Sequence, residues 1–126
     1  MASNYVQTAS NVMDFTAGAD ITAGSVVKVG NVLGVALKDV ASGAVGQIGF
    51  GVFSGIPKVS AAVIGNGESL TWDVSANSGA GAFDDNLATP ASGDVTGAAA
   101  VAVGAVGATV TTMTVKFTGV PGTVTA

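Results

Sequence analysis

Carboxylate side chains are the groups of this sequence best suited to acid, base or metal chemistry. Asp84 and Asp85 are adjacent, so on a strand they would point to opposite faces, whereas in a turn with Asn86 they could bind calcium weakly. No EF-hand spacing follows them, and we interpret them as charges on a solvated loop. Glu68 and Asp73 lie on one expected strand but on its opposite faces. A glycosidase pair would therefore need a second acid from elsewhere in the chain.

Other catalytic chemistry is excluded by residue types that the sequence lacks. Its 126 residues include no cysteine and no histidine, and its four cations are all lysines. A Ser-His-Asp or Cys-His set can therefore not be assembled, and no disulfide can form. The sequence also contains no G-x-G-x-x-G motif and no Walker loop for phosphates. We predict a protein that is not an enzyme, with no catalytic residues, no metal site and no cofactor.

The charges are sparse and predominantly acidic. Eight carboxylates outnumber four lysines, the net charge is −4, and charged residues make up 10% of the chain. This balance repels nucleic acid and anionic membranes, so we expect neither as a partner. One lysine, Lys58, follows a proline and has two interpretations. We favour an edge-strand lysine that discourages open-ended strand pairing, and the alternative is one half of an inter-subunit salt bridge.

Small residues dominate the composition and favour β structure. The chain has 22 Ala, 21 Val and 19 Gly. Valine is enriched in strands, and the glycines fall at the short intervals that are typical of strands joined by turns. Residues 25–29 and 32–37 are apolar runs on either side of Gly30 and Asn31, a two-residue turn that begins with glycine. This pattern predicts a hairpin.

A second hairpin is expected where residues 59–64 meet the glycine-rich turn 65–67, with residues 68–74 as its second strand. Trp72 alternates into the apolar face of that second strand. We therefore expect Trp72 to pack in the core and not to stack on a ligand.

Two further strands are predicted from alternation. The last strong strand, around residues 112–118, places three large side chains on one face: Met113, Val115 and Phe117. Three glycines fall between residues 46 and 53, and two of them, Gly49 and Gly51, lie on the face opposite Ile48, Phe50 and Val52. Glycine at alternate strand positions indicates tight bending or close approach of the backbone.

Two segments interrupt this rhythm of strands and turns. Residues 1–17 carry no turn signal that links them to the rest, so we expect an extended N-terminal arm ahead of a single β domain over residues 18–126. Tyr5 is an aromatic residue in the polar part of this arm and could anchor it in a neighbour's groove; disorder is the alternative. Residues 76–94 form a long loop, which a short strand around Phe83 could divide.

Together these patterns predict an all-β protein, a small glycine-rich antiparallel barrel or sandwich with little or no helix. Large apolar side chains are few, so burial per residue is modest and association would add stability. We therefore do not expect the isolated monomer to be the working unit. No basic stretch precedes an apolar core near the N-terminus, and the longest run without polar side chains, residues 97–108, is too short to span a bilayer. We expect a protein made in the cytosol.

A series of short motifs follows one after another along the chain, and their order is informative. The motifs are Met-Ala-x-Asn-Tyr-Val-Gln at the start, Ala23-Gly24-Ser25-Val26-Val27, Val29-Gly30, Gly34-Val35-Ala36, Asp39-Val40-Ala41-x-Gly43-x-x-Gly46, Gly51-Val52-Phe53, Pro57-Lys58 and Gly67-Glu68-x-x-x-Trp72-Asp73. In this order the motifs resemble the small capsid cement, or head decoration, proteins of tailed phages and prophages. The resemblance covers residues 1–75, with a looser echo over 89–118.

This resemblance implies a structural virion protein that binds the outside of an icosahedral capsid after expansion and reinforces it against the pressure of the internal DNA. The implied partners are the major capsid protein and further copies of the chain, with a homotrimer favoured over a dimer. The chain would be made in the host cytoplasm and would end on the exterior of the virion. We expect contacts with the capsid or between subunits at Asn4, Tyr5, Val6, Gln7 and Lys58.

Two other classes of protein stay open as alternatives. A pilin-like or fibre-like surface subunit would share the composition, although the sequence shows no signal peptide and no cysteine for a disulfide. A small cytosolic ligand-binding β module is the other alternative. A shift in the fluorescence of Trp72 on addition of a small ligand would support that module.

Overall fold

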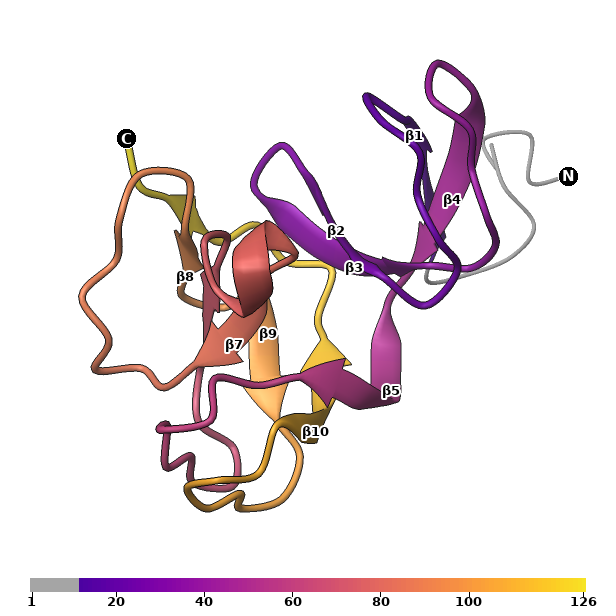
Figure 1. Cartoon of the computed structure of the whole chain (residues 1–126). Helices are drawn as coiled ribbons and strands as arrows, with labels where there is room; N and C mark the ends of the chain where they lie inside the picture. Colours follow the sequence, from indigo (N-terminus) through magenta and orange to yellow (C-terminus); the bar gives the residue numbers. More distant parts are fainter. Residues whose placement is uncertain (1–11) are drawn as a thin grey trace, which may run out of the picture.

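The computed structural model describes residues 12–126, which fold into eleven strands arranged in three antiparallel sheets (Figure 1). Strands account for 44% of the structure. Within the described part of the chain the one helical element is a single 3-10 turn, η1 (Asn77–Gly79), and no helix is long and apolar enough to cross a membrane. The predicted all-β class is therefore confirmed.

The N-terminal half forms a curled four-stranded sheet. Its strands are β1 (Val12–Thr16), β2 (Val26–Val29), β3 (Val32–Ala36) and β4 (Val45–Gly49), in the order β1-β4-β3-β2. The hairpin predicted around Gly30 is confirmed: β2 and β3 pair with Val29 opposite Val32, and Gly30 has a φ of +58°. The curled sheet encloses a small core that includes Phe15, Val27 and Ile48.

The rest of the chain forms two further sheets that join into a ring. The strands are β5 (Gly51–Pro57), β6 (Thr71–Asp73), β7 (Ala82–Asp84), β8 (Val95–Thr96), β9 (Ala100–Ala102), β10 (Thr112–Phe117) and β11 (Thr123–Val124), in the orders β5-β10-β9 and β11-β8-β6-β7. Ser69, just before β6, bridges Val101 of β9, and Lys58, just after β5, bridges Phe83 of β7. These two bridges, of which the one between Lys58 and Phe83 is parallel, close β5, β10, β9, β6 and β7 into a small barrel, one of the two architectures predicted.

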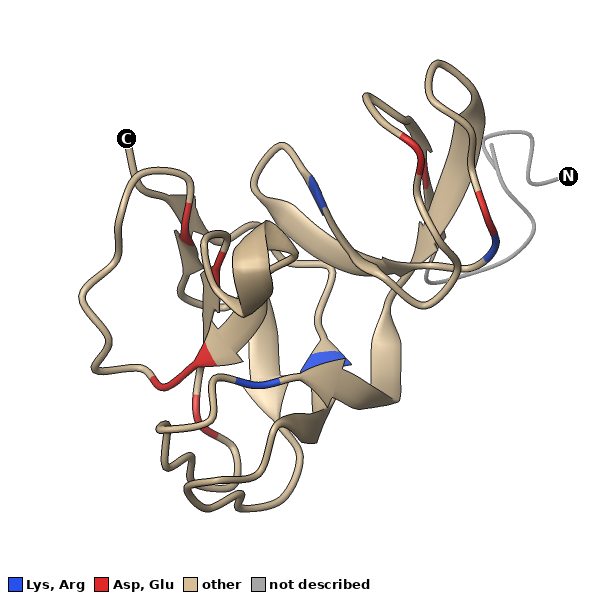
Figure 2. Cartoon of the chain, in the orientation of Figure 1, with Lys and Arg blue, Asp and Glu red and all other residues tan. Residues whose placement is uncertain are grey.

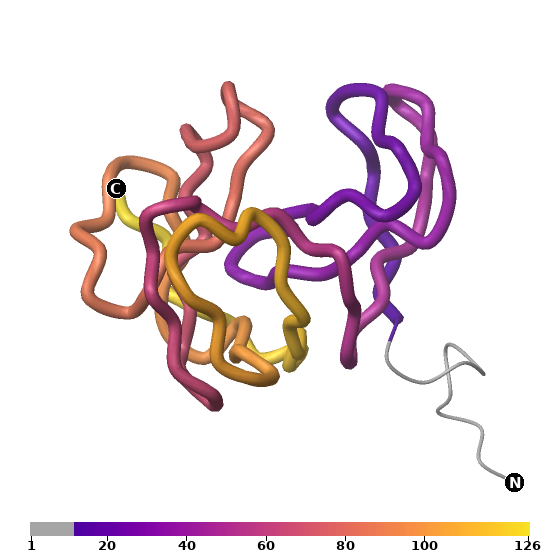
Figure 3. The backbone as a smooth tube through the Cα atoms, turned by 60° about the horizontal axis from the view of Figure 1, so that its bottom comes forward, coloured from indigo at the N-terminus to yellow at the C-terminus, as the bar shows by residue number. Residues whose placement is uncertain are grey.

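β3 is the wall that the barrel shares with the curled sheet. Leu33 and Val35 belong to the large core, whereas Ala36 belongs to the small core. Because alternate side chains point to opposite faces, β3 is buried on both sides. Gly34 is required there, since a Cβ at this position would stand 2.9 Å from the Cβ of Ile48. Figure 3 shows the curled sheet and the barrel meeting along this strand.

Aromatic rings fill the centre of the barrel. The ring of Phe83 lies 4.8 Å from that of Trp72 and 5.8 Å from that of Phe117, and Phe117 in turn lies 5.9 Å from Phe53. Trp72 is 5% exposed, which confirms its predicted place in the core. The predicted inward face of β10 is also confirmed, because Met113, Val115 and Phe117 are all buried.

The second predicted hairpin is wrong. Residues 59–64 form no strand, and residues 68–70 run beside β9 instead: Leu70 N donates to Ala100 O and Ala102 N donates to Glu68 O. Two side chains hold the intervening turn in another conformation, because Glu68 Oε1 accepts from Gly65 N and Asn66 Oδ1 accepts from Gly104 N. The partner of this segment therefore lies 30 to 34 residues further along the chain.

The expected continuous face through Ile48, Phe50 and Val52 is also wrong. Ile48 is fully buried, whereas Val52 is 59% exposed. The chain leaves β4 at Phe50 and enters a different sheet at Gly51, whose φ of +112° is accessible to glycine. The expected close approach of backbone is confirmed at Gly49, where a Cβ would stand 2.8 Å from Leu37 Cδ2.

The two segments that interrupt the expected series of strands and turns, residues 1–17 and 76–94, each contain a strand in the structure. Residues 12–16, the end of the expected arm, form β1 and pair with β4 from Val12 opposite Gly49 to Thr16 opposite Val45. They belong to the sheet because Phe15 is buried in the small core. Residues 1–11 lie outside the described residues. In the 76–94 loop, the short strand expected around Phe83 is present as β7, and the stretch between β7 and β8 swings away from the barrel in Figure 1.

Candidate functional site

The predicted contact residues Asn4, Tyr5, Val6 and Gln7 lie outside the described residues. Their segment joins the fold at Val12, the first residue of β1. Within residues 12–126, β1 pairs with β4 and lies at the edge of the curled sheet. An edge strand presents unpaired backbone groups to which another extended segment can add. The segment therefore emerges beside a surface that can pair with a partner strand.

β1 is held in place by its alternating side chains. Phe15 is 8% exposed and packs in the small core, while Asp14 and Thr16 on the other face are exposed. Gln47 of β4 donates from Nε2 to Asp14 Oδ1 over 3.1 Å. The packing of Phe15 and the hydrogen bond to Asp14 therefore fix the position of β1, the strand that follows residues 1–11.

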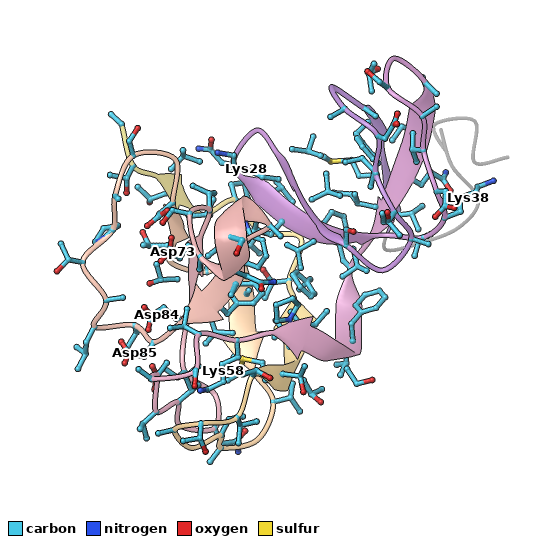
Figure 4. The ribbon with its side chains drawn as sticks, in the orientation of Figure 1. Lys28, Lys38, Lys58, Asp73, Asp84 and Asp85 are labelled. Carbon is cyan, nitrogen blue, oxygen red and sulfur yellow. The ribbon has the colours of Figure 1, made fainter. Side chains whose placement is uncertain are left out.

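Lys58 lies at the end of β5 and is 3% exposed (Figure 4). Its ammonium donates to Val59 O over 2.9 Å, to Val110 O over 3.0 Å and to Ser60 O over 3.4 Å. The interpretation as an exposed edge-strand lysine is therefore wrong, since the side chain instead joins the loop after β5 to the loop before β10. The inter-subunit salt bridge remains a prediction.

A hollow of about 460 Å³ lies beside Lys58. Its lining includes Pro57, Ser60, Asn77, Ala82 and Thr112, so it is bordered by the end of β5, by η1, by the start of β7 and by the start of β10. Sequence reasoning missed this hollow because its walls come from segments far apart in the chain.

A second hollow, of about 480 Å³, lies on the inner side of the curled sheet. Phe15, Ile21, Val27 and Lys28 are among the residues that line it. Lys28 Nζ donates to Gly93 O over 3.0 Å and so ties the edge strand β2 to the loop that leads into β8. Lys28 and Thr16 are the lining residues with polar side chains.

The acidic residues singled out in the sequence stabilise turns. Asp84 Oδ1 accepts from Asp85 N, and Asp85 Oδ1 accepts from Leu87 N. Glu68 uses its second carboxylate oxygen to accept from Asn86 N over 2.8 Å. Asp73, on β6, accepts from the backbone and hydroxyl of Ser75. Figure 2 shows the acids and lysines scattered over the molecule, and within residues 12–126 no group of three metal-ligating side chains comes together.

Exposed valines mark one end of the barrel. Val63 is 65% exposed on the loop after β5, and Val103 and Val110 are 41% and 43% exposed on the loop between β9 and β10. These loops are joined by backbone hydrogen bonds between Ile64 and Val106. The signal in the sequence is the absence of any charged residue from 59 to 67 and from 95 to 115. Such a surface costs little to desolvate in a contact.

Comparison with known protein families gives a match to the phage cement proteins over residues 6–117. The chain belongs to the phage cement protein family. The family resemblance expected from the motifs is thus confirmed, and the match runs well beyond the residues 1–75 on which the clearest motifs lie. Searches of curated proteins and of solved structures returned no match.

The matched region contains every strand from β1 to β10, so both cores of the cement protein lie within it. It includes Val6, Gln7 and Lys58 and begins after Tyr5. Membership supports a structural role in association with a phage capsid, and cement proteins are structural proteins, which agrees with the expectation of a protein that is not an enzyme.

Proposed function

We propose that this cement protein decorates the outside of an icosahedral phage capsid and stabilises it without catalysis. The observation that carries the proposal is the family match over residues 6–117. The partner is the major capsid protein, and the chain is made in the host cytoplasm before it joins the virion exterior. Binding from outside after expansion lets the protein reinforce the shell against the pressure of the packaged DNA.

The fold supports a clamp of this kind. The barrel and the curled sheet share β3, so a load applied to one is passed to the other through a strand buried on both faces. β1 offers an open edge, and it directly follows the segment that carries Asn4, Tyr5, Val6 and Gln7. Strand addition at this edge, together with many identical sites on the shell, would supply affinity through avidity.

Self-association is the second part of the proposal, with a homotrimer favoured over a dimer. The exposed valines Val63, Val103 and Val110 supply apolar area at one end of the barrel, next to segments without charges. Size-exclusion chromatography with light scattering measures the mass of the free protein directly. A trimeric mass at micromolar concentration is the expected result, and a mass that stays monomeric up to high concentration would remove this part of the proposal.

Attachment is tested by removing residues 1–11, which leaves β1 intact. We expect the truncated chain to keep its thermal unfolding transition but to lose co-sedimentation with expanded capsids. A matched pair within the segment sharpens the test: Tyr5→Ala with Val6→Ala removes the large side chains, whereas Thr8→Ala with Ser10→Ala changes small polar ones. Normal decoration by the truncated chain would show that the segment is not needed.

Reinforcement of the shell needs a separate measurement. Expanded, DNA-filled capsids with and without the bound cement protein are heated, and the temperature at which DNA is released is recorded. The decorated capsids are expected to release DNA at a higher temperature. Equal release temperatures at full occupancy would contradict the stabilising role.

A further inference from the structure

The ammonium of Lys58 is a buried charge without an opposite charge among its bonded partners. Its three acceptors, on Val59, Ser60 and Val110, are all neutral backbone carbonyls. Buried charges in proteins are usually paired with a counter-charge, because carbonyl dipoles replace only part of the lost hydration. The distances are also unequal: two bonds are 2.9 and 3.0 Å long, whereas the bond to Ser60 O is 3.4 Å. One hydrogen of the ammonium is therefore weakly held.

Exposed residues with polar side chains line the hollow beside this lysine. Ser60, Asn77, Thr111 and Thr112 all line it, and within the described part of the chain none of their side chains makes a hydrogen bond to another residue. Hydroxyl and amide groups can each donate a hydrogen bond to an anion. The volume of the hollow, about 460 Å³, lies within the range of small-ligand sites.

Backbone strain is concentrated around the same hollow. Among residues 12–126, three residues other than glycine have a positive φ: Asn77 at 54°, Ser78 at 57° and Thr109 at 71°. Asn77 lines the hollow, and Ser78 is the next residue along the chain. Thr109 donates from its backbone N to the backbone O of Ser60, which also lines the hollow. A positive φ at a β-branched threonine is costly, and residues held in such conformations cluster at binding and active sites.

We propose that this hollow binds a carboxylate, supplied by an acidic side chain of the capsid shell. The carboxylate takes the hydrogen of Lys58 that now points to Ser60 O, while the short bonds to Val59 and Val110 keep the ammonium in place. The hydroxyls of Thr111 and Thr112 and the amide of Asn77 provide further donors. The shell as the source of the carboxylate rests on the proposed function, whereas the carboxylate specificity of the hollow does not.

The carboxylate specificity is tested on the isolated full chain with two capped tripeptides, Gly-Asp-Gly and Gly-Asn-Gly. Backbone amide signals of Lys58, Ser60, Thr111 and Thr112 are followed by NMR during each titration. We expect saturable shifts with the aspartate peptide and none with the asparagine peptide. Equal shifts with both peptides, or none with either, would overturn the proposal.

The source is tested with two single substitutions that change the net charge equally. Asn77→Asp places a carboxylate at the hollow, where aspartate tolerates the positive φ, and Asn31→Asp adds the same charge at the exposed turn of the β2-β3 hairpin. We expect Asn77→Asp to weaken binding to expanded capsids by at least about tenfold and Asn31→Asp to leave it unchanged. Equal binding by the two variants would exclude the shell as the source. If the unsubstituted chain binds the aspartate peptide but no capsid, the carboxylate site stands and the proposed function fails.

Discussion

The indole ring of Trp72 lies against the bare α-carbon of Gly81, in the space that a side chain at this position would occupy. A Cβ built on Gly81 would overlap Trp72 Cζ2 and stand 2.8 Å from both Cε2 and Cη2. Trp72 is the middle residue of β6, and Gly81 ends the turn that leads into β7, so the glycine lets β7 close over the ring. The ring in turn contacts Phe83 at the centre of the barrel.

Gly81→Ala is therefore expected to be strongly destabilising. Gly81 has a φ of +91°, so alanine adds about 1–2 kcal/mol of backbone strain and about 1–3 kcal/mol of overpacking against the ring. Gly79→Ala is the matched control, because Gly79 also has a φ of +91° but no heavy atom within 4 Å of the point where its Cβ would stand. Chemical denaturation should show a larger decrease in the free energy of unfolding for Gly81→Ala than for Gly79→Ala. Equal losses would mean that the ring moves aside without cost.

Gly46 and Val40 form a second close contact, in the small core. A Cβ on Gly46 would overlap Val40 Cγ2 and stand 3.2 Å from Cγ1. Because the φ of Gly46 is not positive, Gly46→Ala tests packing alone; we expect it to cost about 1–3 kcal/mol. Adding Val40→Ala removes the overlapping methyl groups, so the cost of Gly46→Ala should fall by about 1 kcal/mol in a double-mutant cycle. Strict additivity of the two substitutions would contradict direct contact.

Local patterns predicted those parts of the fold that depend on neighbouring residues. The β2-β3 hairpin follows from Gly30, and the inward face of β10 follows from alternation over six residues. The hairpin predicted over residues 59–74 is wrong because a distant strand competes with the local turn signal. Glu68 and Leu70 pair with β9 instead. Turn residues favour reversal of the chain but do not specify which strand lies alongside.

The candidate site was harder to predict for the same reason. Lys58 was singled out because of its proline neighbour, but its burial depends on Val110 O, which is 52 residues away in the sequence. Its hollow also needs Asn77, on a turn between two other strands. No pattern near Lys58 carries that information. The continuous apolar run of β3, by contrast, was visible in the sequence and is explained by burial on both faces.

Lys58 is predicted to hold the two loops at the end of the barrel together. Lys58→Met keeps the length of the side chain but leaves Val110 O without its donor and leaves Val59 O with Ala62 N as its remaining donor, at an expected cost of about 1–3 kcal/mol. The loss should be local: the amide of Thr109, which donates to Ser60 O, should exchange its hydrogen faster. Lys38→Met is the control, since Lys38 is exposed, and it should change stability by less than about 0.5 kcal/mol. Unchanged exchange at Thr109 in Lys58→Met would show that the lysine does not hold the loops.

Asp94 also holds two segments of the chain together, at the point where the long loop, residues 76–94, returns to the barrel. It is 3% exposed, and its carboxylate accepts from Val74 N over 3.1 Å and from Ala91 N over 2.9 Å, one oxygen to each. Asp94→Asn replaces one of these oxygens by an NH₂ group that faces a backbone N–H. Both N–H groups are partly buried, so leaving one of them unsatisfied should cost about 1 kcal/mol.

Asp85→Asn is the matched control for this substitution. Asp85 uses Oδ1 to accept from Leu87 N, and an asparagine oxygen can accept the same bond, so the change in stability should stay within about 0.5 kcal/mol. Thermal unfolding of both variants, followed by the fluorescence of Trp72, measures the difference. Because Asp94 O also accepts from Thr125 N, Asp94→Asn should loosen β11 first, seen as faster exchange of the Thr125 amide before the barrel unfolds. An Asp94→Asn protein as stable as Asp85→Asn would mean that water or a rearranged loop replaces the lost acceptor.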